Sequence, residues 1–154
     1  MKLTKLGIAI SLVIIGGLTA GCSDEGGTYK KISPAKVEKI DGSKLKRITL
    51  TPESMIRIDL KTAVVREMQV QVNGKSSVVR KVVPYGSLIY DEYGKTWVYA
   101  RTNERSFERK AVQIDYIEGN NVVLNDGPPQ KTEIATSGAA ELYGVEGGIG
   151  GGKK

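Results

Sequence analysis

The sequence predicts an all-β fold, a small antiparallel β-roll or barrel of about six to eight strands with at most one short helix. Three observations lead to this prediction. Short runs rich in β-branched and aromatic residues recur along the chain, and residues that favour turns separate these runs. No long stretch repeats its apolar residues with the period of a helix, and no heptad run or internal repeat is present.

Residues 1–21 are typical of a signal peptide. Lys2 and Lys5 precede an apolar run, Leu6 to Ala20, which at about 15 residues is shorter than the ~20 that span a bilayer. Small residues then lead to Cys22, the only cysteine, in an arrangement that resembles the lipobox of bacterial lipoproteins, although Thr19 stands at its usual aliphatic position. We therefore expect a lipid on Cys22. The alternative is an ordinary signal peptide that leaves a free thiol.

Residues 22–42 are polar and glycine-containing, a composition typical of a flexible tether. Seven Lys or Arg residues lie between Lys30 and Arg47, whereas the region from Ile48 to Gly152 holds twelve basic and thirteen acidic residues. The basic segment has two interpretations, a contact with anionic lipid headgroups and a solvated linker. Because the folded part is close to neutral, we expect no binding to nucleic acid.

The folded domain is expected at residues 43–143. Its first strand candidate, 44–50, is followed by the signals of a short helix, because Thr51 can cap the N-terminus and Pro52 suits the first helical position. Glu53 adds a negative charge at the positive end of the helix dipole. Residues 56–60 also alternate between apolar and polar, so a strand is the alternative.

The remaining elements are predicted strands joined by turns. Asn73-Gly74 predicts a type I′ turn, and Asp91 to Gly94 predicts a hairpin turn with a left-handed residue at Gly94. The last stretch, 144–154, is rich in glycine and is expected to be disordered. The strand candidates after the helix are 64–72, 76–83, 87–90, 96–101, 107–114, 121–124 and 132–136.

Two aromatic residues in the second hairpin are candidates for a site. Trp97 and Tyr99 lie on the same face of one predicted strand. Core or cross-strand packing is the simpler interpretation. The alternative is an exposed aromatic patch, made by Trp97 and Tyr99, that docks a partner.

The chain lacks the groups on which common enzymes depend. It contains no histidine, and its one cysteine is assigned to a lipid, so ordinary zinc, copper or iron sites lack their usual ligands. The carboxylates are scattered and form no calcium-loop pattern. The glycines at 147–152 lack the neighbouring strand, helix and Ser or Thr of a P-loop. We expect no enzyme, no cofactor and no metal site.

From Val83 onward, the order of motifs resembles the C-terminal region of periplasmic adaptors, the HlyD-like membrane fusion proteins of RND-type efflux pumps. The motifs are "VP", "WVYA", "FERKAV", "GNNVVL", "DGP" and "IATSGAAEL". The matching residues are Pro84, Gly94, Val98, Phe107, Arg109 or Lys110, Val112, Gly119, Val122, Gly127, Ile134, Gly138 and Leu142.

The segment 48–72 resembles the part of these adaptors in which a strand, a short helix and a Gly-Ile-x-Thr-like turn lead into a strand. Thr62 matches that turn. Three residues depart from the family pattern: Asp59 replaces the glycine of this turn, Pro128 replaces a leucine, and Lys131 replaces a second turn glycine. In such adaptors the two ends of the chain form the membrane-proximal domain. The lipoyl-like domain and helical hairpin between those ends have no counterpart here.

The resemblance implies a lipid-anchored envelope protein that faces the periplasm and is an accessory or assembly component of a transport system. Its partners would be the membrane, through the lipid, and an RND-type transporter or other efflux subunits. Ser23 lacks the aspartate that retains many lipoproteins of enteric bacteria in the inner membrane, whereas lipid-anchored adaptors favour that membrane, so both membranes stay open. The alternative function is a stand-alone periplasmic lipoprotein for ligand binding, sensing or scaffolding.

Overall fold

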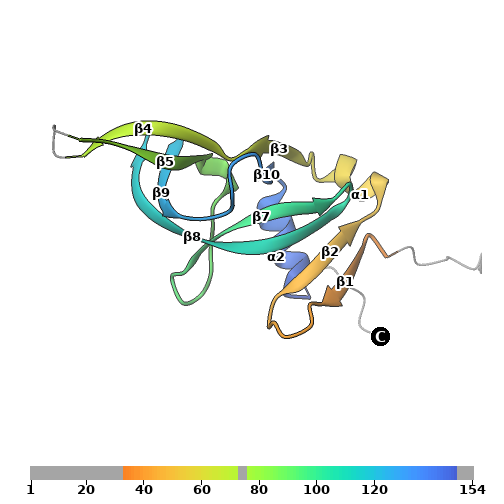
Figure 1. Ribbon diagram of the computed structural model, residues 1–154. Coiled ribbons are helices and arrows are strands. Elements are labelled where there is room, and N and C mark those ends of the chain that lie inside the picture. Colours follow the sequence, from red (N-terminus) through yellow and green to blue (C-terminus); the bar gives the residue numbers. More distant parts are fainter. Residues whose placement is uncertain (1–32, 73–75, 149–154) are drawn as a thin grey trace, which may run out of the picture. The chain divides into compact units, whose positions relative to one another are not determined.

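The computed structural model describes residues 33–72 and 76–148 (Figure 1). The fold class is the predicted one: the described chain is mostly β and forms a curled antiparallel sheet, a half-barrel of seven strands. The order in this sheet is β3-β10-β7-β8-β9-β5-β4, and β1, β2 and β6 pair beside this path. The strands are β1 (Ala35–Lys39), β2 (Lys46–Leu50), β3 (Lys61–Val64), β4 (Arg66–Val72), β5 (Ser76–Pro84), β6 (Ile89–Tyr90), β7 (Thr96–Asn103), β8 (Ser106–Glu118), β9 (Asn121–Asp126) and β10 (Glu133–Ser137).

The predicted short helix is confirmed as α1 (Pro52–Arg57). Its N-cap is Thr51, whose hydroxyl oxygen accepts a hydrogen bond from the backbone N–H of Ser54 at 3.2 Å. A 3₁₀ turn, η1 (Tyr85–Ser87), follows β5. Within the described ranges no helix is long and apolar enough to cross a membrane.

The sequence-based boundaries of the domain need two corrections. Strand β1 lies inside the predicted tether and pairs antiparallel with β2, from Ala35 opposite Leu50 to Lys39 opposite Lys46. Its charged side chains are those of a peripheral strand, which is why its composition resembles a linker. A second helix, α2 (Ala139–Glu146), continues past Tyr143 into the predicted tail, because Val145 and Glu146 pack against the domain.

Both predicted hairpins are present. Strands β4 and β5 pair along the full length of β4, from Arg66 opposite Val82 to Val72 opposite Ser76. The predicted turn at Asn73-Gly74 lies outside the described residues. In the β6–β7 hairpin, Gly94 has a φ of 74°, as expected, and its N–H donates to the carbonyl of Asp91 at 3.0 Å.

The sheet buries apolar residues on both faces. One cluster, which includes Ile48, Tyr99, Phe107 and Leu142, lies on the face of β7 and β8 that α2 covers (Figure 1). A second cluster fills the inside of the curl with residues such as Val83, Val98, Val122, Leu124 and Ile134. Because Val98 and Tyr99 are neighbours on β7 and belong to different clusters, this strand is buried from both sides.

Candidate functional site

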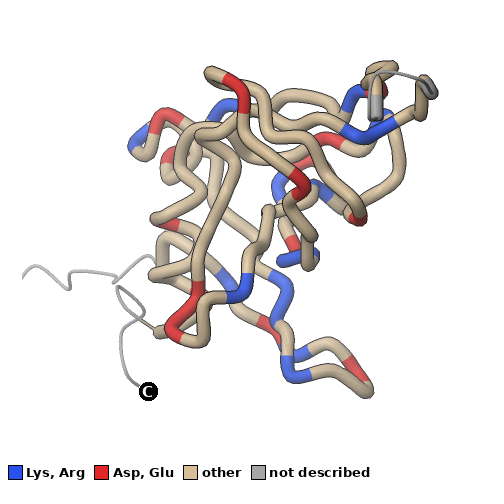
Figure 2. Tube along the Cα trace, turned by 90° about the vertical axis from the view of Figure 1, so that its left-hand side faces the viewer, with Lys and Arg blue, Asp and Glu red and all other residues tan. Residues whose placement is uncertain are grey.

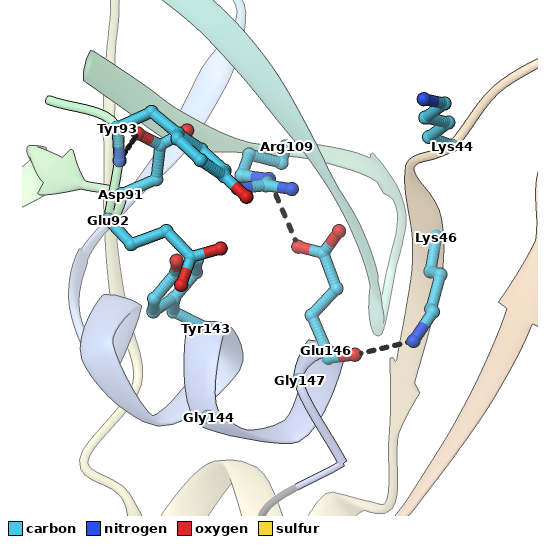
Figure 3. Close-up of a pocket in the computed structure, with 10 residues that line it drawn as sticks. All are labelled: Lys44, Lys46, Asp91, Glu92, Tyr93, Arg109, Tyr143, Gly144, Glu146 and Gly147. Atoms are coloured by element: carbon cyan, nitrogen blue, oxygen red, sulfur yellow. Dashed lines mark hydrogen bonds and ion pairs between the residues drawn. The ribbon is translucent and has the colours of Figure 1, made fainter. Parts of the chain in front are cut away.

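A pocket of about 520 Å³ lies where the β6–β7 turn, strand β8, the start of β2 and the end of α2 meet (Figure 3). Its wall carries charges of both signs and two tyrosines. The basic residues are Lys44, Lys46 and Arg109, the acidic residues are Asp91, Glu92 and Glu146, and the tyrosines are Tyr93 and Tyr143.

Arg109 is the fixed cation of this pocket. Its guanidinium carbon lies 4.4 Å from the ring centre of Trp97 and 5.5 Å from that of Tyr143, distances typical of cation–π contacts. The side chain is only 15% exposed, and its Nε lies 3.3 Å from Oε2 of Glu146. That ion pair is poorly directed, so Nε makes no hydrogen bond within the described chain. Arg109 is therefore held by stacking and charge, with donor capacity left over.

Glu146 joins the end of α2 to the sheet. Its carboxylate, 6% exposed, accepts a hydrogen bond from the hydroxyl of Tyr99 at 2.5 Å. Burial and this hydrogen bond to a charged acceptor raise the pKa of Tyr99, so the phenol keeps its proton. Lys46 donates from Nζ to the backbone carbonyl of Glu146 at 2.8 Å, which satisfies one acceptor at the end of the helix.

Asp91 organises the opposite wall. Its Oδ2 accepts a hydrogen bond from the indole N–H of Trp97 at 2.9 Å, and its Oδ1 accepts from the backbone N–H groups of Tyr93 and Lys95 at 3.0 and 2.9 Å. Desolvation raises the pKa of Asp91, but these three hydrogen bonds outweigh it, and the net pKa is lowered. The ionised carboxylate thus fixes both the turn and the ring that stacks on Arg109.

The residues predicted as a docking patch have different environments. Tyr99 is fully buried, with its hydroxyl on Glu146, so its interpretation as an exposed docking residue is wrong and core packing describes it. Trp97 is half-buried and stacks on Arg109, and its role in docking stays a prediction. Cys22, the predicted lipid site, lies outside the described residues.

Sequence reasoning did not identify the pair of Arg109 and Glu146. One signal was available, because Phe107 and Arg109 are two apart on one strand and therefore share a face. Arg109 sits opposite Tyr99 in the sheet, so a cation on this apolar face needs an acidic partner. The partner is Glu146, which ends helix α2. Its surrounding sequence is rich in glycine and therefore did not predict a helix.

A second buried carboxylate, Glu108, belongs to the opposite side of β8. It accepts hydrogen bonds from Arg47 at 2.8 Å and from Lys110 at 3.0 Å. Desolvation raises the pKa of Glu108, but these two cations outweigh it, and the net pKa is lowered. Because Arg47 and Lys110 both bind the carboxylate of Glu108, this cluster links strand β2 to strand β8.

Two features of the described residues limit the possible ligands: the distribution of charge and the arrangement of side chains that could bind a metal ion. Basic and acidic residues are interspersed along the described trace (Figure 2). Among the described residues, no group of three or more His, Cys, Asp or Glu side chains is arranged to hold a metal ion.

Comparisons of the chain with protein-family models, with curated proteins and with solved structures find no match.

Proposed function

We propose that this protein is a lipid-anchored component of the bacterial cell envelope that docks on an RND-type or related efflux transporter. Its domain would correspond to the membrane-proximal domain of periplasmic adaptors. The proposal joins the resemblance in the sequence to one observation on the backbone.

The observation is the set of residues whose backbone φ is positive, in the left-handed region. Across the described residues of 48–142, five residues have positive φ: Asp59 (47°), Gly94 (74°), Gly119 (58°), Lys131 (67°) and Gly138 (78°). All five fall at positions where the resemblance places glycine, including Asp59 and Lys131, the two that depart from it. Side chains rarely adopt this conformation, so a family with this fold would favour glycine at each position.

A sixth glycine of the resemblance, Gly127, lies where a side chain would not fit. A Cβ atom on Gly127 would lie 2.9 Å from Cδ1 of Leu124 and 3.2 Å from Cγ1 of Val112, both in the buried cluster inside the curl. Glycine adopts left-handed backbone in the turns of many folds, so the two positions that carry most weight are Asp59 and Lys131, which are not glycine in this chain. This agreement is the main support for the proposal.

The pairing of the strands supports the same proposal. Strand β3, from the first part of the domain, pairs with β10 near its end, as in a domain assembled from two separated segments. Strands β4 and β5 then close directly on each other, at the place where an adaptor chain would leave for its lipoyl-like domain and helical hairpin. We therefore propose a role beside the transporter, without a bridge to an outer-membrane channel.

Affinity purification from cross-linked intact cells tests this function. The tagged protein is expressed at its native level, and the recovered proteins are identified by mass spectrometry. The proposal predicts enrichment of a transporter subunit relative to an unrelated lipoprotein with the same tag. If no transporter subunit is enriched, the proposed partner is wrong.

The pocket at Arg109 favours a second candidate, a stand-alone lipoprotein that binds a periplasmic ligand. It predicts ligand binding without any enriched transporter subunit in the same cells. The two candidates are thus separated by the purification, whatever the pocket binds.

A further inference from the structure

We propose that the pocket beside Arg109 binds a small molecule through an oxyanion, a carboxylate or phosphate group, received by the guanidinium of Arg109. This inference does not depend on the transport proposal, since it rests on the pocket alone. With about 520 Å³, the pocket has the size of typical small-molecule sites.

Arg109 is preorganised to receive an anion. Stacking between Trp97 and Tyr143 holds the plane of the guanidinium, and Glu146 holds its Nε side. The guanidinium lines the pocket (Figure 3), and the hydrogen bonds of the described residues include none from its two terminal nitrogens. A guanidinium fixed in this way presents two parallel N–H donors, which is the geometry that carboxylate and phosphate groups accept.

Several charged groups around the pocket already have hydrogen-bond or ion-pair partners. Asp91 is satisfied by Trp97 and two backbone N–H groups, and the Glu146 carboxylate by Tyr99 and Arg109. Lys46 is bound to a backbone carbonyl. Among the cationic groups, the terminal nitrogens of Arg109 and the Lys44 ammonium across the opening remain (Figure 3). The hydrogen-bonding capacity that remains around the pocket is therefore mainly donor capacity, which suits an anion.

Glu92 limits which anion fits. Its carboxylate points toward the pocket from the β6–β7 turn (Figure 3). The side chain of Glu92 raises the pKa of the Tyr93 phenol, through a hydrogen bond and through its negative charge. A doubly charged anion would be repelled, whereas a zwitterion could place its ammonium near Glu92 and its oxyanion near Arg109. Phosphoethanolamine, free or as a lipid headgroup, and amino acids have this chemistry.

Fluorescence of Trp97 tests the site directly, because it is the only tryptophan and stacks on Arg109. The purified full-length protein is titrated at constant ionic strength with acetate, inorganic phosphate, free phosphoethanolamine and a short-chain phosphatidylethanolamine below its micelle concentration. Sodium chloride is the reference titration. We expect a saturable change for at least one oxyanion and none for chloride. Response to the lipid alone assigns a headgroup, and response to a free anion assigns a soluble ligand.

Two variants and one control locate the binding. Arg109→Lys keeps the charge but removes the fork, and it should weaken binding at least tenfold. Glu92→Gln, on the exposed turn, should strengthen the binding of inorganic phosphate severalfold. The control is Arg101→Lys, because Arg101 also stacks on an aromatic ring, Phe107, and pairs with Glu133 outside this pocket. No saturable response to any oxyanion, or equal binding by Arg109→Lys and the wild type, would overturn the proposal.

Discussion

Glu146 ends helix α2 with a buried carboxylate that receives the hydroxyl of Tyr99 at 2.5 Å and lies 3.3 Å from Nε of Arg109. One carboxylate thus ties the helix to two neighbouring strands, β7 and β8. Since a buried charge is costly without partners, each partner should contribute measurably to stability.

We predict that Tyr99→Phe lowers the free energy of unfolding by about 1–2 kcal/mol, because it removes a hydrogen bond to a charged group without creating a large cavity. Urea unfolding followed by circular dichroism measures the change. The matched control is Tyr90→Phe in the same hairpin, where the ring is half exposed, and it should change the stability little. Equal effects of the two variants would contradict the account of Glu146.

The lowered pKa of Glu108 predicts a dependence of stability on pH. A carboxyl group whose pKa is lower in the folded state stabilises the fold at pH values above its unfolded pKa of about 4.3 and loses this contribution as the pH falls through its folded pKa. Glu108→Gln should therefore lose less stability than the wild type between about pH 6 and about pH 3. Parallel curves of unfolding free energy against pH would show that Glu108 contributes nothing to acid unfolding.

At the scale of the secondary-structure elements, two turns contain residues with strained backbone conformations. Asp59 and Lys131 adopt left-handed backbone without being glycine, and both lie next to a strand of the β3–β10 pair. Lys131 is fixed there by its N–H, which donates to the carbonyl of Val65 at 2.9 Å. Aspartate tolerates this conformation better than lysine does.

We predict that Lys131→Gly raises the free energy of unfolding by about 0.5–1 kcal/mol, and that Asp59→Gly has a smaller effect. Gly119→Ala serves as the opposite control: nothing lies within 4 Å of its added Cβ, so only the positive φ is disfavoured, and stability should fall. Thermal and urea unfolding measure all three variants. Destabilisation by Lys131→Gly would argue against the correspondence with glycine positions.

The elements also show what the sequence could predict. Thr51 and Pro52 identified α1, and Gly94 identified a hairpin turn, because these signals act within a few residues. Strand β1 and the end of α2 were missed, because their side chains resemble a linker and a tail until a distant partner is present. The pocket was missed for the same reason: Arg109 and Glu146 are far apart in the chain and meet only through packing.

At the scale of the whole molecule, we propose separate tasks for Cys22 and the β domain. A lipid on Cys22 would hold the protein at the membrane, and the β domain would bind the partner. We predict that the wild type incorporates radiolabelled palmitate and sediments with membranes, and that Cys22→Ser does neither. A Cys22→Ser protein that stays membrane-bound would show that something other than a lipid on this residue holds it.

The same variant supplies a control for the partner. If docking needs a tethered domain, Cys22→Ser should reduce the recovery of a transporter subunit although the β domain still folds, as its unchanged urea midpoint would show. This separation matters because a folding defect would otherwise imitate a loss of docking.

Cross-linking mass spectrometry on intact cells tests the central claim most directly. Exposed lysines of the domain, such as Lys61, Lys95 and Lys131, lie on different strands and turns and serve as points of attachment. The account predicts cross-links from a subset of these lysines, on one side of the domain, to a transporter subunit. Cross-links only within the protein itself, or scattered among unrelated envelope proteins from all of these lysines alike, would contradict it.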